Sequence, residues 1–282
     1  MDNPELYSQT NVIPRAAATQ FLDEFASKIK WKESGDSIID LGCGDGSVTC
    51  ILKKYVPNNY DIFIACDINK KMIEYAREQH CDENITFTVF DVQSVIPDEL
   101  RRGFNHVFSF LLLHWIPNQE QAFKTIYDFM NAGGDCFVTI VASNPINNLF
   151  DAVGRDPTKK WGSTWIKNLS TFVSIYCHME DPEKYITNIM KNIGFIKIDV
   201  KLRNMSYVFE NIVAYKRFVK ALEPYGMPDD VFEDFFQDFI SAGKDRQIIN
   251  EDIDDLNDLK KTVDFKYNII VIHAGKSEES PH

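Results

Sequence analysis

The fold is decided by the stretch IIDLGCGDGS, which occupies residues 38–47. Its apolar beginning predicts a buried strand, and the pattern that follows it predicts a helix over residues 48–55. Between the two, Gly42, Gly44 and Gly46 permit positive φ angles and let a ligand approach the main chain, which a Cβ atom would prevent. The spacing is G-x-G-x-G, whereas the dinucleotide fingerprint is G-x-G-x-x-G. The stretch therefore predicts a strand–turn–helix unit with a ligand-binding turn.

Three carboxylates accompany the ends of three successive predicted strands, which cover residues 37–41, 62–67 and 85–91. Open α/β sheets bind their ligands at this edge. We expect Asp40 to repel phosphates and to attract the ammonium group of an amino-acid tail. Asp67 is placed to accept hydrogen bonds from ribose hydroxyls, and Asp91 to lie near an adenine amino group. The pattern fits a nucleoside that carries a cation.

Strands and helices alternate through the first half of the chain, which predicts a parallel sheet with right-handed crossovers. Residues 1–15 are expected to be irregular, and helices are expected at residues 16–30, 70–79 and 119–130. Further strands are expected at residues 105–110 and, after a turn at Gly133–Gly134, at residues 135–142. Beyond residue 143 we expect helices near residues 146–153, 163–169, 183–193, 211–222 and 229–242. Two more strands are expected at residues 195–202 and 262–274.

The glycine motif and the two downstream acids resemble those of class I S-adenosylmethionine-dependent methyltransferases. This resemblance implies an α/β, Rossmann-like sheet that is parallel except for an antiparallel edge hairpin, with helical lid insertions. It implies four regions: a segment and helix over the site (1–30), the cofactor-binding core (31–142), a substrate-side insertion (143–181), and the last strands with a helical lid (182–282). The cofactor implied is S-adenosyl-L-methionine, bound by Asp40, Gly42, Cys43, Gly44, Asp67, Ile68, Asp91, Val92 and Phe108.

Several motifs narrow the resemblance to the insect juvenile hormone acid O-methyltransferases. They are F-S-F-x-x-L-H-W at 108–115, L-Y-x-x-x-N at 6–11, D-E-F-A-S at 23–27, I-K-W-K at 29–32 and E-D-P-E-K at 180–184. The similarity implies methylation of the carboxylate of an isoprenoid acid, either juvenile hormone acid or farnesoic acid. Trp115 and His114 are the implied catalytic candidates, and Asn11, Pro14 and Trp115 the implied substrate-binding residues.

One position departs from that family. A glutamine in the N-terminal segment usually donates a hydrogen bond to the substrate carboxylate, and the register set by Tyr7 and Asn11 puts Pro14 there. Proline has neither a side-chain donor nor a backbone N–H. A charge-assisted hydrogen bond contributes about 1.5 to 3 kcal/mol, which corresponds to roughly 10- to 150-fold in transition-state binding. Gln9, Asn11 and Arg15 are the nearby candidates for compensation.

Composition excludes other classes of protein. The chain has 42 acidic and 30 basic residues, for a net charge of -12, which disfavours nucleic acid as a partner. No stretch approaches the length of an apolar membrane span, and there is no apolar signal segment. The six cysteines show no C-x-x-C pair or metal-like spacing, so we expect reduced thiols, no metal and a cytoplasmic location. The sequence is compatible with a homodimer.

Three hypotheses follow. The first is an isoprenoid-acid O-methyltransferase. The second is a diverged relative that methylates another small or fatty acid, or that binds cofactor with little activity because of Pro14. The third is a non-catalytic cofactor-binding partner protein, which only the acidic C-terminal helices favour. Ester formation from labelled cofactor and a panel of acids discriminates among them.

Overall fold

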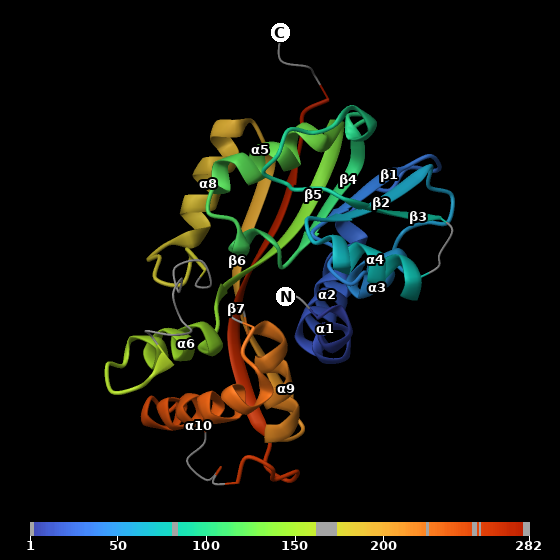
Figure 1. Cartoon of the computed structure of the whole chain (residues 1–282). Helices are drawn as coiled ribbons and strands as arrows, with labels where there is room; N and C mark the ends of the chain where they lie inside the picture. The colour runs from blue at the N-terminus through green and yellow to red at the C-terminus, as the bar shows by residue number, and fades with distance from the viewer. Residues whose placement is uncertain are drawn as a thin grey trace. The chain divides into compact units, whose positions relative to one another are not determined.

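A single seven-stranded sheet forms the centre of the residues that the structure describes. The computed structural model describes residues 3–80, 84–161, 174–223, 226–249, 253 and 255–278. The strand order is β3-β2-β1-β4-β5-β7-β6 (Figure 1). The strands are β1 (Ser37–Leu41), β2 (Ile62–Asp67), β3 (Ile85–Val89), β4 (Phe104–Phe110), β5 (Met130–Ser143), β6 (Ile196–Phe209) and β7 (Val263–Gly275).

The first five strands pair in parallel, and β7 runs against them. Parallel pairs join β3 to β2, β2 to β1, β1 to β4 and β4 to β5. Lys276 donates its backbone N–H to the carbonyl of Gly134, and the Asn268 amide donates to the Ser143 hydroxyl. Because residue numbers fall along β7 as they rise along β5, β7 is antiparallel to β5. The predicted α/β sheet with an antiparallel edge is confirmed.

Six of the described helices begin after an asparagine or aspartate whose side chain caps them. The described helices are α1 (Pro4–Thr10), α2 (Val12–Phe25), α3 (Ser47–Lys53), α4 (Lys70–Gln79), α5 (Gln119–Phe129), α6 (Pro145–Arg155), α8 (Pro182–Ile193), α9 (Ile212–Leu222) and α10 (Asp229–Asp245). Side chains of Asn69 and Asn118 accept hydrogen bonds from the first turns of α4 and α5. Asp181 does the same for α8, which ends at Gly194 with a φ of 111°. Such caps satisfy N–H groups that lack a partner within the helix.

The prediction of an irregular N-terminal segment is wrong. Asn3 caps α1, whose first residue is Pro4, and Pro14 is the third residue of α2. Proline does not interrupt a helix in its first turn, because N–H groups there have no acceptor within the helix. The two prolines therefore mark helix beginnings and not breaks. A short 3₁₀ helix, Ala26–Lys28, follows α2.

Two strand boundaries also differ from the prediction. β3 ends at Val89, so Asp91 lies two residues beyond it. β5 begins at Met130, and the expected Gly133–Gly134 turn is a bulge opposite Phe104–His106. A Cβ on Gly134 would lie 2.8 Å from the carbonyl oxygen of Asn105, so only glycine fits there. The helix predicted over residues 163–169 lies outside the described residues.

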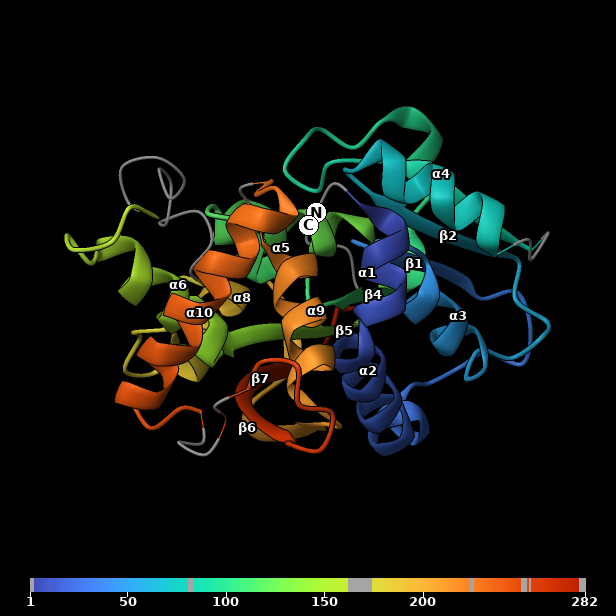
Figure 2. The same ribbon diagram turned by 60° about the horizontal axis from the view of Figure 1, so that its bottom comes forward.

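The chain divides into two compact units. Unit 1 comprises Met1–Asn11, Val141–His178 and Asn204–Ile269, and unit 2 comprises Val12–Ile140, Met179–Arg203 and Ile270–His282. An aromatic core fills unit 1, where Phe150 of α6 contacts Phe235 and Phe239 of α10 with ring centroids 5.0 and 5.5 Å apart. Figure 2 shows α9 alongside α10, and the rings of Tyr215 and Phe236 join them at 6.3 Å.

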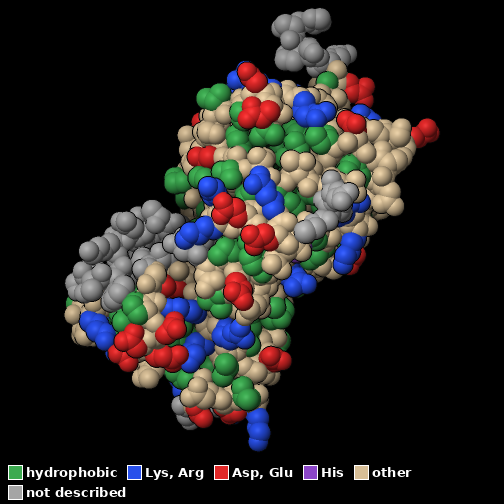
Figure 3. Space-filling view, turned by 45° about the vertical axis from the view of Figure 1, so that its right-hand side comes forward, with side chains coloured by type: hydrophobic (Ala, Val, Ile, Leu, Met, Phe, Trp, Pro, Cys, Tyr) green, Lys and Arg blue, Asp and Glu red, His purple; other side chains and the backbone are tan. Residues whose placement is uncertain are grey.

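The surface carries both signs of charge. On the face drawn in Figure 3, acidic and basic side chains are interspersed among apolar ones. Several pairs are ion pairs, among them Lys159 with Asp238 at 2.7 Å and Lys160 with Asp234 at 3.0 Å. None of the described helices is long and apolar enough to span a membrane.

Candidate functional site

The glycine turn after β1 has the conformation that its sequence predicts. Gly42, Gly44 and Gly46 have φ angles of 79°, 56° and 80°. The backbone N–H groups of Gly42 and Cys43 donate to the carbonyl of Cys66 at 2.7 and 2.9 Å. A Cβ on Gly42 would lie 2.8 Å from the Leu112 side chain. The turn is therefore fixed on one side by β2 and on the other by the segment after β4.

Asp67 connects the glycine turn to the end of β2. Its Oδ2 accepts a hydrogen bond from the Gly44 N–H at 3.0 Å, and its Oδ1 accepts one from the Asn69 N–H at 2.8 Å. Burial raises the pKa of Asp67 above its ordinary value, and the two backbone hydrogen bonds oppose that shift. Ile68, which follows it, is 61% exposed. An exposed apolar side chain beside a half-buried carboxylate suits a ligand with both a flat apolar and a hydroxylated part.

Asp40 is buried beneath the glycine turn. The sequence predicts a carboxylate beside the turn, facing the ligand. The residue is 1% exposed, and the Thr49 hydroxyl of α3 donates to its Oδ2 at 2.7 Å. Its Oδ1 is buried without a hydrogen-bond partner in the described part of the chain. Burial, and secondarily the charge of Asp67, raise the pKa of Asp40 to about 7, against the effect of the Thr49 hydrogen bond. An orphaned buried carboxylate oxygen favours a cationic or hydrogen-bond-donating ligand.

The remaining residues of the expected cofactor set lie in different surroundings. Asp91 is half-buried, and its Oδ1 accepts a hydrogen bond from the Gln93 N–H at 2.9 Å. Val92 and Cys43 are buried. Phe108 is 1% exposed inside β4, where its ring packs on those of Phe110 and Trp31. Phe108 is thus part of an aromatic core and stands two residues before the strand's carboxyl end.

His114 and Trp115 lie on a 3₁₀ turn, Leu113–Trp115, and not on β4 itself, which ends at Phe110. Their ring centroids are 4.9 Å apart. Burial lowers the pKa of His114 to about 3, so its imidazole is neutral at physiological pH. The buried Nδ1 of His114 has no hydrogen-bond partner among the described residues. A neutral imidazole here can exchange hydrogen bonds with a ligand without adding charge.

The N-terminal candidates lie on or between the first two helices. Asn11 is buried at the C-terminal end of α1, where its backbone N–H donates to the Tyr7 carbonyl at 2.8 Å. Pro14 is half-buried in the first turn of α2. The Gln9 amide oxygen, a candidate for compensation, accepts a hydrogen bond from Arg217 at 2.8 Å. Gln9 is therefore already held within unit 1.

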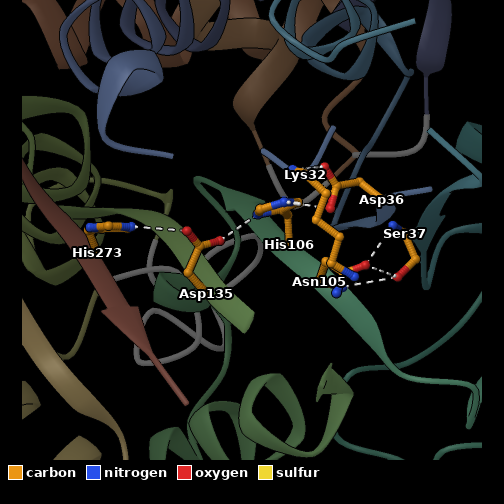
Figure 4. A network of polar contacts seen from close by, with 7 residues as sticks. All are labelled: Lys32, Asp36, Ser37, Asn105, His106, Asp135 and His273. Carbon is orange, nitrogen blue, oxygen red and sulfur yellow. Dashed lines mark hydrogen bonds and ion pairs between the residues drawn. The ribbon is translucent and has the colours of Figure 1, made fainter. Parts of the chain in front are cut away.

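A polar network lies at the opposite edge of the sheet, where the parallel strands begin (Figure 4). The two ring nitrogens of His106 lie 3.3 Å from Asp36 and 2.7 Å from Asp135, and His273 lies 3.4 Å from Asp135. Burial opposes ionisation of Asp135, but the hydrogen bonds from His106 and His273 outweigh it and lower the pKa of Asp135. The network joins the beginnings of β4 and β5 to β7, far along these strands from the glycine turn.

Two residues that bear on the site were not predicted. Leu112 packs on Gly42, and Gln119 is buried beneath the 3₁₀ turn, where its amide contacts two carbonyl groups. From the sequence, Gln119 is expected to be exposed to solvent, because it is a polar residue in the first turn of a helix capped by Asn118. Burial at that place depends on the path of the preceding turn, which periodicity does not predict.

Comparisons with known proteins agree with this geometry. A family model described as "Methyltransferase domain" matches residues 38–134. The chain is 37% identical over 276 residues to the juvenile hormone acid O-methyltransferase of Bombyx mori, covering 98% of each chain. It is 32% identical to the enzyme of the same name from Drosophila melanogaster, covering 99% of this chain and 94% of that one.

Solved structures share the fold. The YcgJ protein of Bacillus subtilis aligns with a TM-score of 0.58 at 14% identity, over 94% of this chain and all of that one. Phosphoethanolamine N-methyltransferase 2 of Haemonchus contortus, in complex with S-adenosyl-L-methionine, aligns with a TM-score of 0.53 at 15% identity, over 97% of this chain and 58% of that one. Fold and glycine turn together define a class I, S-adenosylmethionine-dependent methyltransferase. Within that class, the chain belongs to the juvenile hormone acid O-methyltransferase family.

Proposed function

We propose that this protein methylates the carboxylate of an isoprenoid acid, juvenile hormone acid or farnesoic acid, to give the methyl ester. The observation that carries the proposal is whole-chain similarity to two enzymes that are named for this activity, at 37% and 32% identity. Similarity over nearly the full length covers both the glycine turn and the C-terminal helices. If the proteins shared only a cofactor-binding domain, the similarity would not include the C-terminal helices.

We assign the cofactor to the glycine turn and its carboxylates. The orphaned Oδ1 of Asp40 fits the ammonium group of the amino-acid tail, and Asp67 fits the ribose hydroxyls. Asp91, Val92 and the exposed Ile68 would border the adenine. Gly42, Cys43 and Gly44 would border the methionine part, with Phe108 behind them in the core. When bound, S-adenosylmethionine supplies an electrophilic methyl group on a sulfonium.

The acceptor side needs no general base, because a carboxylate is already ionised at neutral pH. The work of the protein is to orient one carboxylate oxygen and to exclude water. A neutral His114 suits that task, since it adds no charge competing for the carboxylate. We propose that Trp115 and His114 border the acceptor, together with Asn11 and Pro14.

A second function is favoured by one observation, the proline at residue 14. A chain that lacks the glutamine donor would hold a carboxylate less tightly, and would fit a relative that methylates another small or fatty acid. Arg15 is exposed, and Gln9 is engaged by Arg217.

The test is product formation with a panel of acids. Pure protein is incubated with methyl-labelled S-adenosylmethionine and farnesoic acid, juvenile hormone acid, a straight-chain C16 acid and a benzoic acid. We expect methyl ester from the two isoprenoid acids at a kcat/KM at least tenfold above that for the others. Ester from the C16 acid alone would support the diverged relative. Cofactor binding without any ester would contradict the methylation of isoprenoid acids and would leave a protein that binds cofactor with little activity.

We also propose that the protein works in the cytoplasm. The five cysteines in the described residues are free, as thiols are in a reducing compartment. Self-association is proposed through β6, the edge strand, which exposes the apolar side chains of Leu202 and Val208. Light scattering of the parent and of Leu202→Glu tests this: a parent of monomeric mass would refute it.

A further inference from the structure

The segment after β4 is held in an unusual backbone conformation. Leu111 has a φ of 52°, which is rare for a residue with a branched side chain. Its N–H donates to the Thr139 carbonyl at 2.9 Å. The next residue, Leu112, packs on Gly42 of the glycine turn. A strained, pinned segment of this kind persists only where its surroundings determine it.

Gln119 is one of the residues that hold this segment in place. It is the first residue of α5, and it is 2% exposed. Its Nε2 donates to the Leu113 carbonyl at 2.7 Å and to the Ile116 carbonyl at 2.5 Å. One amide group therefore contacts the carbonyl groups on both sides of the residues His114 and Trp115.

The chemistry of these contacts requires a primary amide of this length. A neutral NH₂ group offers two donors and no charge, which matches two buried carbonyl acceptors. A carboxylate in the same place would face two carbonyl oxygens with no hydrogen to donate, and a thioether would leave both without a donor. Asparagine is one methylene shorter, so it cannot reach both acceptors.

The helix behind Gln119 is itself fixed. The Asn118 side chain accepts the Gln121 N–H at 3.1 Å and caps α5. The Ile116 N–H donates to the Leu113 carbonyl at 3.0 Å, which closes the turn. The turn is therefore held in place by the first residue of a capped helix.

We propose that Gln119 is a positioning residue for the reaction: by holding the Leu113 and Ile116 carbonyls, it sets where His114 and Trp115 stand toward the acceptor carboxylate. The inference rests on the proposed function, since it assigns those two side chains to the acceptor. Because Gln119 is 2% exposed and its amide donates to the two carbonyls, we place it behind the turn and not at the acceptor. Its effect passes through the turn.

The first experiment observes the turn directly. The four tryptophans of the parent are labelled with 5-fluorotryptophan, and the Trp115 resonance is assigned with Trp115→Phe. In Gln119→Met we expect the fluorine resonance of Trp115 to shift or broaden while the other three stay in place. Gln119→Asn, which keeps an amide, serves if the methionine variant fails to fold. Gln121→Met is the matched control, because Gln121 lies in the same helical turn and donates instead to Thr125.

The second experiment measures turnover of the same folded variants with farnesoic acid, well below their melting temperatures. We expect kcat to fall roughly tenfold to a hundredfold, as misplacement by about 1 Å does. The Kd for S-adenosylhomocysteine should stay within about twofold, because the contacts of Asp67 are untouched. Gln121→Met should keep the parent's kcat.

Two results would overturn the inference: an unmoved Trp115 resonance, whatever happens to kcat, or a moved resonance with unchanged kcat. The failure of the proposed function looks different. A parent that binds S-adenosylhomocysteine but forms no ester would refute that function, while the fluorine spectra would still decide whether Gln119 holds the turn.

Discussion

Asp67 has a structural function besides the ribose contact that we propose for it, because its two carboxylate oxygens accept hydrogen bonds from the Gly44 and Asn69 N–H groups. Replacing Asp67 with alanine removes both acceptors and the group assigned to the ribose. We predict at least tenfold weaker binding of S-adenosylmethionine in calorimetry, together with a lowered melting temperature. Asp98→Ala is the control, since Asp98 is exposed on a separate short helix, Asp98–Leu100. Equal affinity in Asp67→Ala and parent would refute the assignment.

The protonation of Asp40 should be linked to cofactor binding. The pKa of Asp40 is raised to about 7 by burial and by Asp67, so the carboxyl is largely protonated at pH 6. A bound ammonium group stabilises the carboxylate and lowers that pKa, so binding releases a proton and tightens as the pH rises from 6 to 8. Calorimetry in two buffers of different ionisation enthalpy measures the proton released.

Asp40→Asn is the matched variant for that experiment. It keeps an acceptor for the Thr49 hydroxyl but has no titrating proton. We expect its binding to be weaker and independent of pH over the same range. Because the folded pKa lies above the unfolded one, ionisation of Asp40 also costs stability as the pH rises toward 7, and the variant should lose that dependence. Binding by the parent without proton exchange would contradict the linkage.

We predict that Pro14 limits the turnover of this chain with an acid as acceptor. Because Pro14 lies in the first turn of α2, glutamine can replace it without a change of backbone. We predict that Pro14→Gln raises kcat/KM for farnesoic acid by roughly tenfold or more, and that Trp115→Ala abolishes turnover. Unchanged turnover in Pro14→Gln with intact cofactor affinity would mean that another group already holds the carboxylate.

For single residues, the sequence predicted those properties that depend only on the residue and its neighbours in the chain. Glycines that need positive φ are visible in a sequence, and Gly42, Gly44 and Gly46 have it. The buried environment of Asp40 was not predicted, because it depends on Thr49 in the following helix. Gln119 was missed for a related reason: the carbonyls it contacts come from a turn whose path is set by Leu111.

At the scale of elements, the helices of unit 1 are the proposed acceptor-binding part of the chain. We predict that α6, α9 and α10 gain protection from amide exchange when S-adenosylhomocysteine and a long-chain acid are both present. Segments that bind ligands are drawn from the less stable parts of a protein, and ligands stabilise them. S-adenosylhomocysteine alone is the control and should protect mainly the turn after β1. No ligand-dependent change in the three helices would refute the assignment.

Elements with regular periodicity were predicted closely, and irregular ones were not. The bounds of β1, β2 and α4 agree with the prediction, because β1 and β2 are short, buried apolar runs and α4 buries apolar residues at helical spacing. The helix α1 was missed because its two-turn length gives little periodicity, and Pro4 reads as a break although it is a helix start. The bulge in β5 was predicted as a turn because a pair of glycines suits both.

At the scale of the molecule, the network of His106, Asp135 and His273 links three strands of the sheet, β4, β5 and β7 (Figure 4). The pKa of Asp135 is lowered despite burial, so its ionised form favours the folded state above the unfolded pKa of about 4. That contribution is lost as the pH falls through the lower, folded value. We predict that Asp135→Asn lowers the melting temperature at pH 7 and that the difference from the parent narrows below pH 4.

Asp128→Asn is the control for acid stability, because Asp128 forms an exposed ion pair with Lys124. Exposed pairs contribute about 0 to 1 kcal/mol, so this variant should follow the parent throughout. An Asp135→Asn protein as stable as the parent at pH 7 would show that the network is not a source of stability.

The division of unit 1 into three chain segments has a consequence for biosynthesis. The aromatic core that joins Phe150 to Phe235 and Phe239 brings together residues far apart in sequence, and contacts of long sequence separation form late because loop closure must precede them. The five parallel strands, in contrast, all lie between residues 37 and 143 and follow one another along the chain. These five strands are therefore synthesised before α9 and α10, the helices that complete the core of unit 1. During that interval the apolar face of α6 that carries Phe150 cannot yet pack against Phe235 and Phe239 of α10, and we expect it to stay exposed to water.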